Sequence, residues 1–286
     1  MTITRRLALT ATLATPALLP QGAIAQDAWP SRPVRWIVPF SPAGTTDITA
    51  RLAAEMVSRR IGQQVVVENR PGASGNIGAE MVARSAPDGY TMLVNAISTA
   101  AINHSLFGER MPVKPEDLTG VALLIQVPNV IIVPASSPIR TLQGLIEAAR
   151  ARPGGLNYGS AGSGGSGHLG FELFKLRAGV NIVHVGFRGA GPMLIEIVAG
   201  RLDTACDNMP SCIGHIRDGR LRALAVTSAE RAFALPDVPT FAEAGVPNAE
   251  ATGWFGVQAP ARTPRPIVER MGAELDAVTR DPAYRT

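Results

Sequence analysis

Residues 34–56, VRWIVPFSPAGTTDITARLAAEM, contain the patterns of a strand, a polar loop and a helix in succession. Residues 34–38 form a short apolar run of strand length, and residues 39–46 are rich in Pro, Ala, Gly, Ser and Thr. Ile48, Leu52, Met56 and Val57 then recur at helical spacing, which predicts a helix with this apolar stripe facing a core. Because the first N–H groups of such a helix point back into the loop, the loop is a candidate anion site.

The same plan returns twice in the second half of the chain. Residues 157–174 carry the glycine-serine loop NYGSAGSGGSG before a helical pattern, and residues 183–197 carry VHVGFRGAGP, where Pro192 suits the first turn of a helix. In open α/β sheets, ligands bind at the carboxyl ends of the strands, where all three loops are expected. Together the loops predict a pocket for a small anion. The alternative is that the glycines only form tight turns beside packed helices.

Further strand and helix patterns alternate along the chain and predict an α/β fold. Apolar strand-sized runs occur at residues 64–69, 91–94, 118–127, 130–133 and 221–226, with helical patterns between several of them. Strands that are apolar throughout, rather than alternately, predict mainly parallel sheets with helices on both faces. A length of 286 residues favours about two domains.

The N-terminus has the pattern of an export signal. Arg5 and Arg6 precede an uncharged, Leu- and Ala-rich stretch that ends at Ala25, so we expect residues 1–25 to be cleaved and the mature protein to be soluble and exported. Pro16 and Pro20 argue against a membrane anchor, and the twin-arginine and general export routes both remain open.

The remaining charge and cysteine pattern excludes several classes of protein. Without Arg5 and Arg6, 25 of the 27 basic residues remain, against 23 acidic residues, and the sequence has no basic block. Nucleic acid is therefore not an expected partner. The four histidines lack metal-ligand spacing, so we expect no metal. Cys206 and Cys212 lie close enough in sequence to allow a disulfide in an exported protein without requiring one.

Two catalytic or cofactor motifs are only partly matched by the glycine-serine loop. Residues 162–167 satisfy G-x-G-x-x-G, but the next strand pattern ends at His184 and Val185 without the acidic residue that a dinucleotide fold needs, so no cofactor is expected. Ser163 and Ser166 each miss the G-x-S-x-G nucleophile pattern by one residue. An exported α/β serine hydrolase, with one of these serines beside His168, therefore remains the alternative to a binding protein.

Several ordered motifs resemble those of the extracytoplasmic solute receptors of tripartite tricarboxylate transporters, the Bug family of periplasmic binding proteins. The most specific is VENRPGASGNIGA at residues 67–79, continued by PDGYT at 87–91. Others are GS at 159–160 with HL at 168–169, LRALAVT at 221–227, LPDVPT at 235–240, EAG at 243–245 and AP at 259–260. These motifs cover essentially the whole mature chain.

The resemblance implies a two-domain periplasmic-binding-protein fold of type II-like architecture, with crossing strands and an interdomain cleft. It implies that a small carboxylate is held by loop backbone groups and water, then passed to integral-membrane transporter subunits. We expect domain 1 at residues 26–125 and 229–286, domain 2 at 126–228, a periplasmic location and a monomer. The candidate ligand-binding residues are Phe40, Ser41, Ala43, Gly44, Thr45, Asp47, Asn95, Ser98, Ser160, Gly162, Ser163, Gly164, Ser166, His168, Arg188, Gly189 and Asp207.

Three positions depart from the family pattern. Ala43 stands where a glycine is common, which predicts a less close backbone approach to the ligand. GFRG at residues 186–189 replaces a usual Pro-Tyr-Lys-Gly and removes a phenolic hydroxyl from the expected cleft. Relatives continue beyond the position of Thr286, so we expect the C-terminal segment that packs on the first domain to be shortened.

A sensory receptor that presents its ligand to a membrane kinase would share this pattern, and the particular carboxylate is not predicted.

Overall fold

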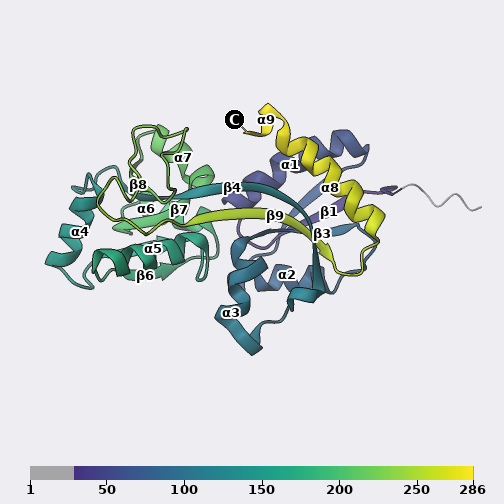
Figure 1. Ribbon diagram of the computed structural model, residues 1–286, viewed down its shortest axis with the longest axis horizontal. Coiled ribbons are helices and arrows are strands. Elements are labelled where there is room, and N and C mark those ends of the chain that lie inside the picture. Colours follow the sequence, from purple (N-terminus) through teal and green to yellow (C-terminus); the bar gives the residue numbers. More distant parts are fainter. Residues whose placement is uncertain (1–28, 286) are drawn as a thin grey trace, which may run out of the picture.

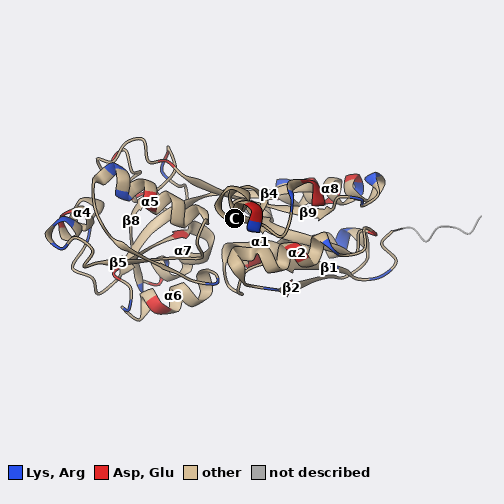
Figure 2. Ribbon diagram, turned by 90° about the horizontal axis from the view of Figure 1, so that it is seen from below, with Lys and Arg blue, Asp and Glu red and all other residues tan. Residues whose placement is uncertain are grey.

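The computed structural model describes residues 29–285, which form two lobes joined by two long crossing strands (Figure 1). The crossing strands are β4 (Leu118–Pro134) and β9 (Thr252–Pro260). The expected export signal and its cleavage after Ala25 lie outside the described residues. Lys, Arg, Asp and Glu are spread over both lobes and do not gather in one place (Figure 2).

The first lobe consists of strand–loop–helix units at the beginning of the chain and two helices at its end. Its elements, besides parts of the crossing strands, are β1 (Val34–Val38), α1 (Thr45–Ile61), β2 (Val65–Asn69), η1 (Ala73–Gly75), α2 (Asn76–Ala83), β3 (Thr91–Ala96), η2 (Ser98–Ile102), α3 (Asn103–Phe107), η3 (Gly108–Arg110), η4 (Pro115–Asp117), α8 (Arg265–Arg280) and α9 (Pro282–Arg285). This confirms the strand, loop and helix predicted from residues 34–56.

The second lobe repeats the plan. Its elements are α4 (Leu142–Ala151), β5 (Asn157–Ser160), α5 (Ser166–Ala178), β6 (Val183–Gly186), α6 (Ala190–Val198), β7 (Thr204–Asn208), α7 (Met209–Arg217) and β8 (Leu221–Val226). The hydroxyl of Thr141 caps α4 by accepting the Gly144 N–H at 3.0 Å. Tyr158 on β5 stacks on Phe171 of α5 with 3.8 Å between ring centroids, which fastens the helix to the sheet.

The face that α1 buries differs in part from the predicted one. Ile48 and Leu52 are 39% and 37% exposed, so this part of the predicted stripe does not face the core, whereas Val57 is buried and Met56 packs against the same core. The helix instead buries its small side chains, together with two larger ones, namely Ala50, Ala53, Ala54, Val57 and Ile61. Alanines bring a helix axis closer to the sheet than Ile or Leu would, and close packing determines which face is buried here. The helix ends at Gly62, whose φ of 70° suits a glycine.

The sheets are mixed rather than mainly parallel. Parallel pairing joins β1 to β2 and β3 in the first lobe, and β5 to β6 and β7 in the second. The crossing strands pair antiparallel: β9 with β3 and β4, and β4 with β7 and β8. Long-range return of the chain through β9 creates these antiparallel pairs, and local apolar patterns carry no information on that pairing.

One continuous strand, β4, serves both lobes. It pairs with β9 from Leu118 to Pro128 and changes partner at Asn129, which is opposite Asn208 of β7. The two apolar runs predicted at residues 118–127 and 130–133 are therefore a single strand. At the change of partner, the Asn129 N–H donates to Thr227 Oγ1 at 2.9 Å and Asn129 Nδ2 donates to the Ala251 carbonyl at 3.0 Å.

The segment between β8 and β9 packs on the second lobe. Phe241, Val246 and Ala249 join the core around Phe171, and Ala232 and Leu235 join the core beneath α6 and α7. The structure thus returns to the first lobe at β9, from Thr252, and not at the expected residue 229. The Pro- and Gly-rich composition of the segment indicated a connection, but the apolar side chains within it decide which lobe it covers.

The two cysteines are buried free thiols, Cys206 on β7 and Cys212 on α7. Burial raises the pKa of both thiols, so neither is a reactive thiolate at neutral pH. In the described part of the chain, no helix combines the length and apolar character needed to cross a membrane.

Candidate functional site

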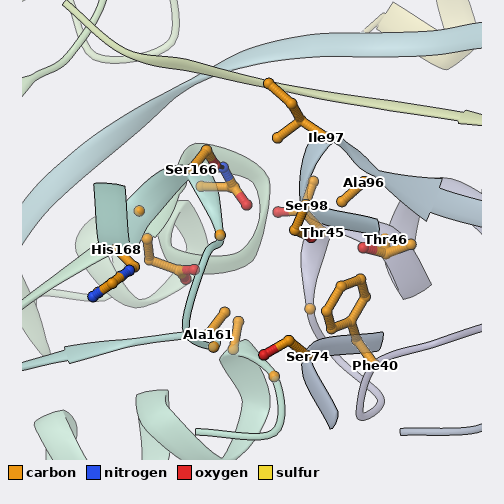
Figure 3. A pocket seen from close by; sticks show the side chains of 18 of the residues that line it. Phe40, Thr45, Thr46, Ser74, Ala96, Ile97, Ser98, Ala161, Ser166 and His168 are labelled. Atoms are coloured by element: carbon orange, nitrogen blue, oxygen red, sulfur yellow. Dashed lines mark hydrogen bonds between the residues drawn. The ribbon is translucent and has the colours of Figure 1, made fainter. Parts of the chain in front are cut away.

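A pocket lies between the lobes, at the ends of strands from both of them (Figure 3). The first lobe contributes Phe40, Thr45, Thr46, Ala96 and Ser98 on one side, and the second contributes Ala161, Ser166 and His168 on the other. The empty space is about 600 Å³ including the open mouth, which suits a small molecule. Phe40, Ala96 and Phe255 give the pocket an apolar part, while the remainder is lined by hydroxyls and backbone.

Four helices begin at this pocket. The residues that precede their first turns are Gly44 for α1, Gly165 for α5, Gly189 for α6 and Asn208 for α7, and all four line the pocket. None of the four has a side-chain capping hydrogen bond. The first N–H groups of these helices are therefore left for a ligand or water, and the helix dipoles favour negative charge at the same place.

No Lys or Arg is among the described residues that line the pocket. The side chains there that titrate are Asp207, His168 and Cys206. Attraction for an anion must then come from helix starts and hydroxyl groups. Within residues 29–285, no group of three or more His, Cys, Asp or Glu side chains is placed to hold a metal ion.

Of the predicted site residues, ten line the pocket: Phe40, Gly44, Thr45, Ser98, Gly162, Ser163, Ser166, His168, Gly189 and Asp207. The three loops of residues 39–46, 160–168 and 186–191 all contribute to it. The pattern of glycine, serine and threonine before a helix was thus a usable signal.

Asp47 and Ala43 shape the first loop from outside the pocket lining. Asp47 Oδ2 accepts the Ala43 N–H at 3.0 Å, and its Oδ1 accepts Asn69 Nδ2 and Arg51 Nε. Burial favours the protonated form of Asp47, but these hydrogen bonds outweigh burial and lower its pKa. Ala43 has a left-handed φ of 64°, a conformation that glycine adopts without strain.

Ser160, Gly164 and Asn95 also lie behind the lining. Ser160 Oγ is 2.8 Å from His184 Nε2, and the Gly164 N–H donates to His168 Nδ1 at 3.1 Å. The side chain of Asn95 hydrogen-bonds Gln258 on the neighbouring strand β9. These three residues therefore support the pocket wall. Their positions do not favour the direct ligand contact that the sequence predicted for them.

Ser41 and Arg188 lie outside the pocket lining and contact each other across the lobes. Ser41 donates both its N–H, at 3.1 Å, and its hydroxyl, at 2.9 Å, to the Arg188 carbonyl oxygen. The Arg188 side chain is exposed. Arg188 therefore makes the contact between the lobes through its backbone carbonyl and not through its guanidinium.

Several lining residues were not predicted. Ser74 lies within the most specific family motif, at residues 67–79, and has a φ of 55°, a backbone conformation that a serine does not predict. Asn208 Nδ2 and Ser166 Oγ both donate to Asn129 Oδ1, at 2.8 and 2.9 Å, so the partner change of β4 also fixes the pocket wall. The other unpredicted lining residues are Thr46, Ala96, Ile97, Ala161, Gly165, Gly167, Ala190, Cys206 and Phe255.

Two histidines pack beside the pocket. His184 on β6 lies 4.1 Å from His168, measured between ring centroids, and contacts the Tyr158 ring. Burial, then the neighbouring His168, lowers the pKa of His184 to about 4. Burial also lowers the pKa of His168. Both rings are therefore neutral at pH 7 and serve as packed hydrogen-bonding groups.

Asp207 is the single carboxyl group among the described lining residues. It is 1% exposed, and burial raises its pKa to about 7, although the hydrogen bond from Ser211 acts in the opposite direction. Ser211 Oγ donates to Asp207 Oδ2 at 2.6 Å and lies 3.2 Å from Thr45 Oγ1 of the first lobe. Asp207 is thus connected through Ser211 to the start of α1.

The sequence is similar to several known proteins. A UPF0065 protein from the tcbD-tcbE intergenic region of Pseudomonas sp. strain P51 is 45% identical over 258 residues, which cover 90% of this chain and 76% of that protein. Protein BugT of Bordetella pertussis is 38% identical over 262 residues, which cover 91% and 80% of the two chains.

Solved structures show the same fold. Rpa4515 of R. palustris, solved with adipate, has a TM-score of 0.87 and 41% identity, with 89% of this chain and 85% of that chain covered. MatC of Rhodopseudomonas palustris, solved with bound malate, has a TM-score of 0.85 and 33% identity, with 90% and 88% covered. These matches confirm the two-domain α/β periplasmic-binding-protein fold.

Residues 49–286 match the family described as tripartite tricarboxylate transporter family receptor. The match extends over most of the chain, and BugT is among the relatives, so the resemblance found in the motifs is confirmed. This chain therefore belongs to the tripartite tricarboxylate transporter receptor family of solute-binding proteins.

Proposed function

We propose that this protein captures a small carboxylate in the periplasm and delivers it to the membrane subunits of a tripartite tricarboxylate-type transporter. The observation that carries the proposal is the meeting of four uncapped helix starts at one pocket without a Lys or Arg in its described lining. Two relatives of the same fold bind dicarboxylates, adipate in one and malate in the other.

The ligand carboxylate is held by backbone N–H groups at the starts of α1, α5 and α6, with hydroxyls of Thr45, Ser98 and Ser166 within the same lining. A hydrogen bond to a charged group contributes about 1.5–3 kcal/mol, and a favourable helix start up to ~2 kcal/mol. A few such contacts suffice for a micromolar ligand, which needs roughly 8 kcal/mol.

The two lobes act as the closing halves, with a hinge where β4 changes partner at Asn129 and where β9 begins at Thr252. We also propose that the protein is a monomer and that the signal at residues 1–25 directs its export. Size-exclusion chromatography with light scattering tests the monomeric state. Fractionation of cells that produce the full chain tests the export.

The protein acts as a receptor and not as a hydrolase. Ser166 Oγ donates to Asn129 Oδ1, and His168 Nδ1 accepts the Gly164 N–H, so this serine and this histidine are engaged elsewhere. Ser160 does contact His184, but Ser160 is 1% exposed and away from any attacking position. A fluorophosphonate serine probe should leave the protein unlabelled.

A thermal-shift screen tests the function. The panel contains acetate, adipate, malate, citrate and aspartate, with the uncharged diamide of adipic acid as control. A carboxylate that binds the folded protein raises the melting temperature in proportion to RT ln(1 + [L]/Kd), and the diamide does not. If none of the acids raises it, or if the diamide does so equally, carboxylate capture is wrong.

A further inference from the structure

Asp207 has one carboxylate oxygen without a partner in a pocket that is otherwise suited to anions. Its Oδ2 accepts Ser211 Oγ, while its Oδ1 is buried and has no hydrogen-bond partner in the described structure. A buried, unpaired carboxylate oxygen costs free energy, so a group that pairs with Oδ1 is expected when the site is filled.

The groups that face Asp207 include no compensating cation. On its own strand it follows Cys206, and α7 contributes Ser211 and Cys212. The neighbouring helix α5 carries His168, Glu172 and Lys175, and Lys175 is paired with Glu172 at 2.7 Å. Strands β5 and β6 carry Tyr158 and His184, and α1 carries Asp47, which is paired with Arg51 at 3.0 Å. Arg188, on the loop before α6, has an exposed side chain.

A ligand cation is a poor match for this position. An ammonium group next to Asp207 would also lie among four helix starts, whose partial positive charges oppose it. A ligand carboxylate is favoured by the same helix starts, but an ionised Asp207 would repel it. The two requirements agree only if Asp207 is neutral and its Oδ1 carries a proton that the ligand can accept.

We propose that Asp207 binds the ligand as a neutral carboxylic acid and donates an Oδ1–H hydrogen bond to a carboxylate oxygen of the ligand. The inference rests on the proposed function, because it assumes a carboxylate ligand. Where Asp207 is ionised in the free protein, it takes this proton from solvent on binding and returns it on release. No covalent bond forms or breaks in the ligand. Asp207 is thereby a specificity-determining residue for ionised acids.

The proposal fixes the direction of the pH dependence. The pKa of Asp207 is about 7 without ligand, and a bound carboxylate raises that pKa further. Below pH 7 the acid is already protonated and affinity is constant. Above pH 7 each binding event takes up a proton, so affinity falls by up to tenfold per pH unit. An ionised Asp207 that accepts from a ligand hydroxyl or ammonium would produce the opposite trend.

Titration calorimetry with adipate and with malate tests the proposal. Wild type is measured from pH 6 to pH 9, with Tris and HEPES at pH 8 to obtain proton uptake from their different ionisation enthalpies. We expect nearly one proton taken up at pH 8 for both ligands. Asp207→Asn, whose amide donates as the neutral acid would, should bind within about threefold of the wild-type affinity at pH 6, independently of pH and without proton uptake.

Asp218→Asn is the matched control. Asp218 follows the last turn of α7, is exposed and is paired with Arg220 away from the pocket, so this variant should keep the wild-type pH dependence. Constant wild-type affinity from pH 6 to pH 9, proton uptake that persists in Asp207→Asn, or loss of adipate binding in folded Asp207→Asn would each overturn the inference. In those cases the acids still bind wild type and the proposed function stands; if no acid of the thermal-shift panel binds wild type, the proposed function fails instead.

Discussion

Ser41 of the first lobe and Arg188 of the second are joined by two hydrogen bonds to one acceptor, the Arg188 carbonyl oxygen. Beside them, Gly189 has a φ of 146°, and a Cβ at this position would lie 2.9 Å from the Ser41 nitrogen. The two loops therefore approach through their backbones. This contact closes one side of the pocket, and it depends on glycines of the second lobe.

Gly191→Ala should weaken ligand binding without impairing folding. A Cβ on Gly191 would lie 2.5 Å from the Pro42 carbonyl oxygen of the opposite lobe, and Gly191 lacks a left-handed φ that would strain an alanine. The clash exists only when the lobes meet, and overpacking of this kind costs about 1–3 kcal/mol. Calorimetry with an acid that binds wild type should show an affinity lower by roughly 5- to 150-fold.

Gly214→Ala is the matched control, because Gly214 lies in α7 and a Cβ there would meet nothing within 4 Å. Both substitutions place alanine in a helix, where it is favoured over glycine by about 1 kcal/mol. Unchanged affinity in Gly191→Ala would show that binding does not need this approach of the lobes.

Arg188→Gln should reduce affinity only slightly. The contact across the lobes uses the Arg188 carbonyl, which glutamine retains, and the exposed guanidinium lies outside the pocket lining. Charge interactions at exposed positions contribute about 0.2–1 kcal/mol, so a loss of less than about fivefold is expected at 0.15 M salt. Titration calorimetry measures the affinity of Arg188→Gln. A loss of 100-fold or more would make Arg188 the principal anchor and contradict the backbone site.

Local patterns explain which parts of the site could be predicted from sequence. Apolar strand-sized runs followed by Gly, Ser and Thr identified the loops around Gly44, Ser163 and Gly189, because a helix start after such a loop is a local feature. Gly44 and Gly164 were both predicted to bind the ligand, but neither is a position where a side chain would enter the pocket. A Cβ on Gly44 would make an ordinary 3.5 Å contact, and that on Gly164 would meet Leu106 and Asn103 instead of the pocket.

Features that depend on distant pairing were not predicted. Asn129 gains its role because β4 exchanges β9 for β7 at that residue, and Phe255 reaches the pocket because β9 returns between β3 and β4. The exposure of Ile48 and Leu52 on α1 also depends on how closely the helix packs on its sheet. Sequence periodicity identified the helix, whereas tertiary packing selected its buried face.

His184→Gln should make the protein less sensitive to acid. The pKa of His184 is about 4 in the fold, whereas the ordinary value for a histidine is 6.5. As pH falls from about 6.5 to about 4, this histidine binds a proton in the unfolded chain but not in the folded chain. The free energy of unfolding therefore decreases over this pH range. Glutamine can keep a hydrogen bond to Ser160 without titrating. Urea denaturation at pH 7 and pH 4.5 should show a smaller loss for His184→Gln than for wild type.

His104→Gln serves as the comparison, because His104 lies on α3 in the first lobe, away from the pair formed by His168 and His184. It should lose as much stability on acidification as wild type does. An equal loss in His184→Gln would assign the acid sensitivity to other groups.

Asp207→Asn should stabilise the ligand-free protein, and more at pH 8 than at pH 5. The pKa of Asp207 is about 7 in the fold, whereas the ordinary value for an aspartate is 3.8, because burial opposes its charge. Between these values the folded chain holds a proton that the unfolded chain has released, so stability falls as pH rises from about 4 to about 7 and the loss is complete above that range. Each unit of pKa difference corresponds to about 1.4 kcal/mol, which sets a loss on the order of a few kcal/mol.

Asparagine removes the buried charge, keeps an oxygen for Ser211 and places no ionisable group at the site. Differential scanning calorimetry of the ligand-free protein should therefore show a melting temperature several degrees above wild type at pH 8 and a smaller gain at pH 5. Asp218→Asn, which removes an exposed charge from the same lobe, should show no such difference between the two pH values. If Asp207→Asn gains equally at both pH values, or is destabilised at pH 8, then Asp207 is ionised and satisfied in the free protein, because only an acid that folding protonates gives a gain that grows with pH.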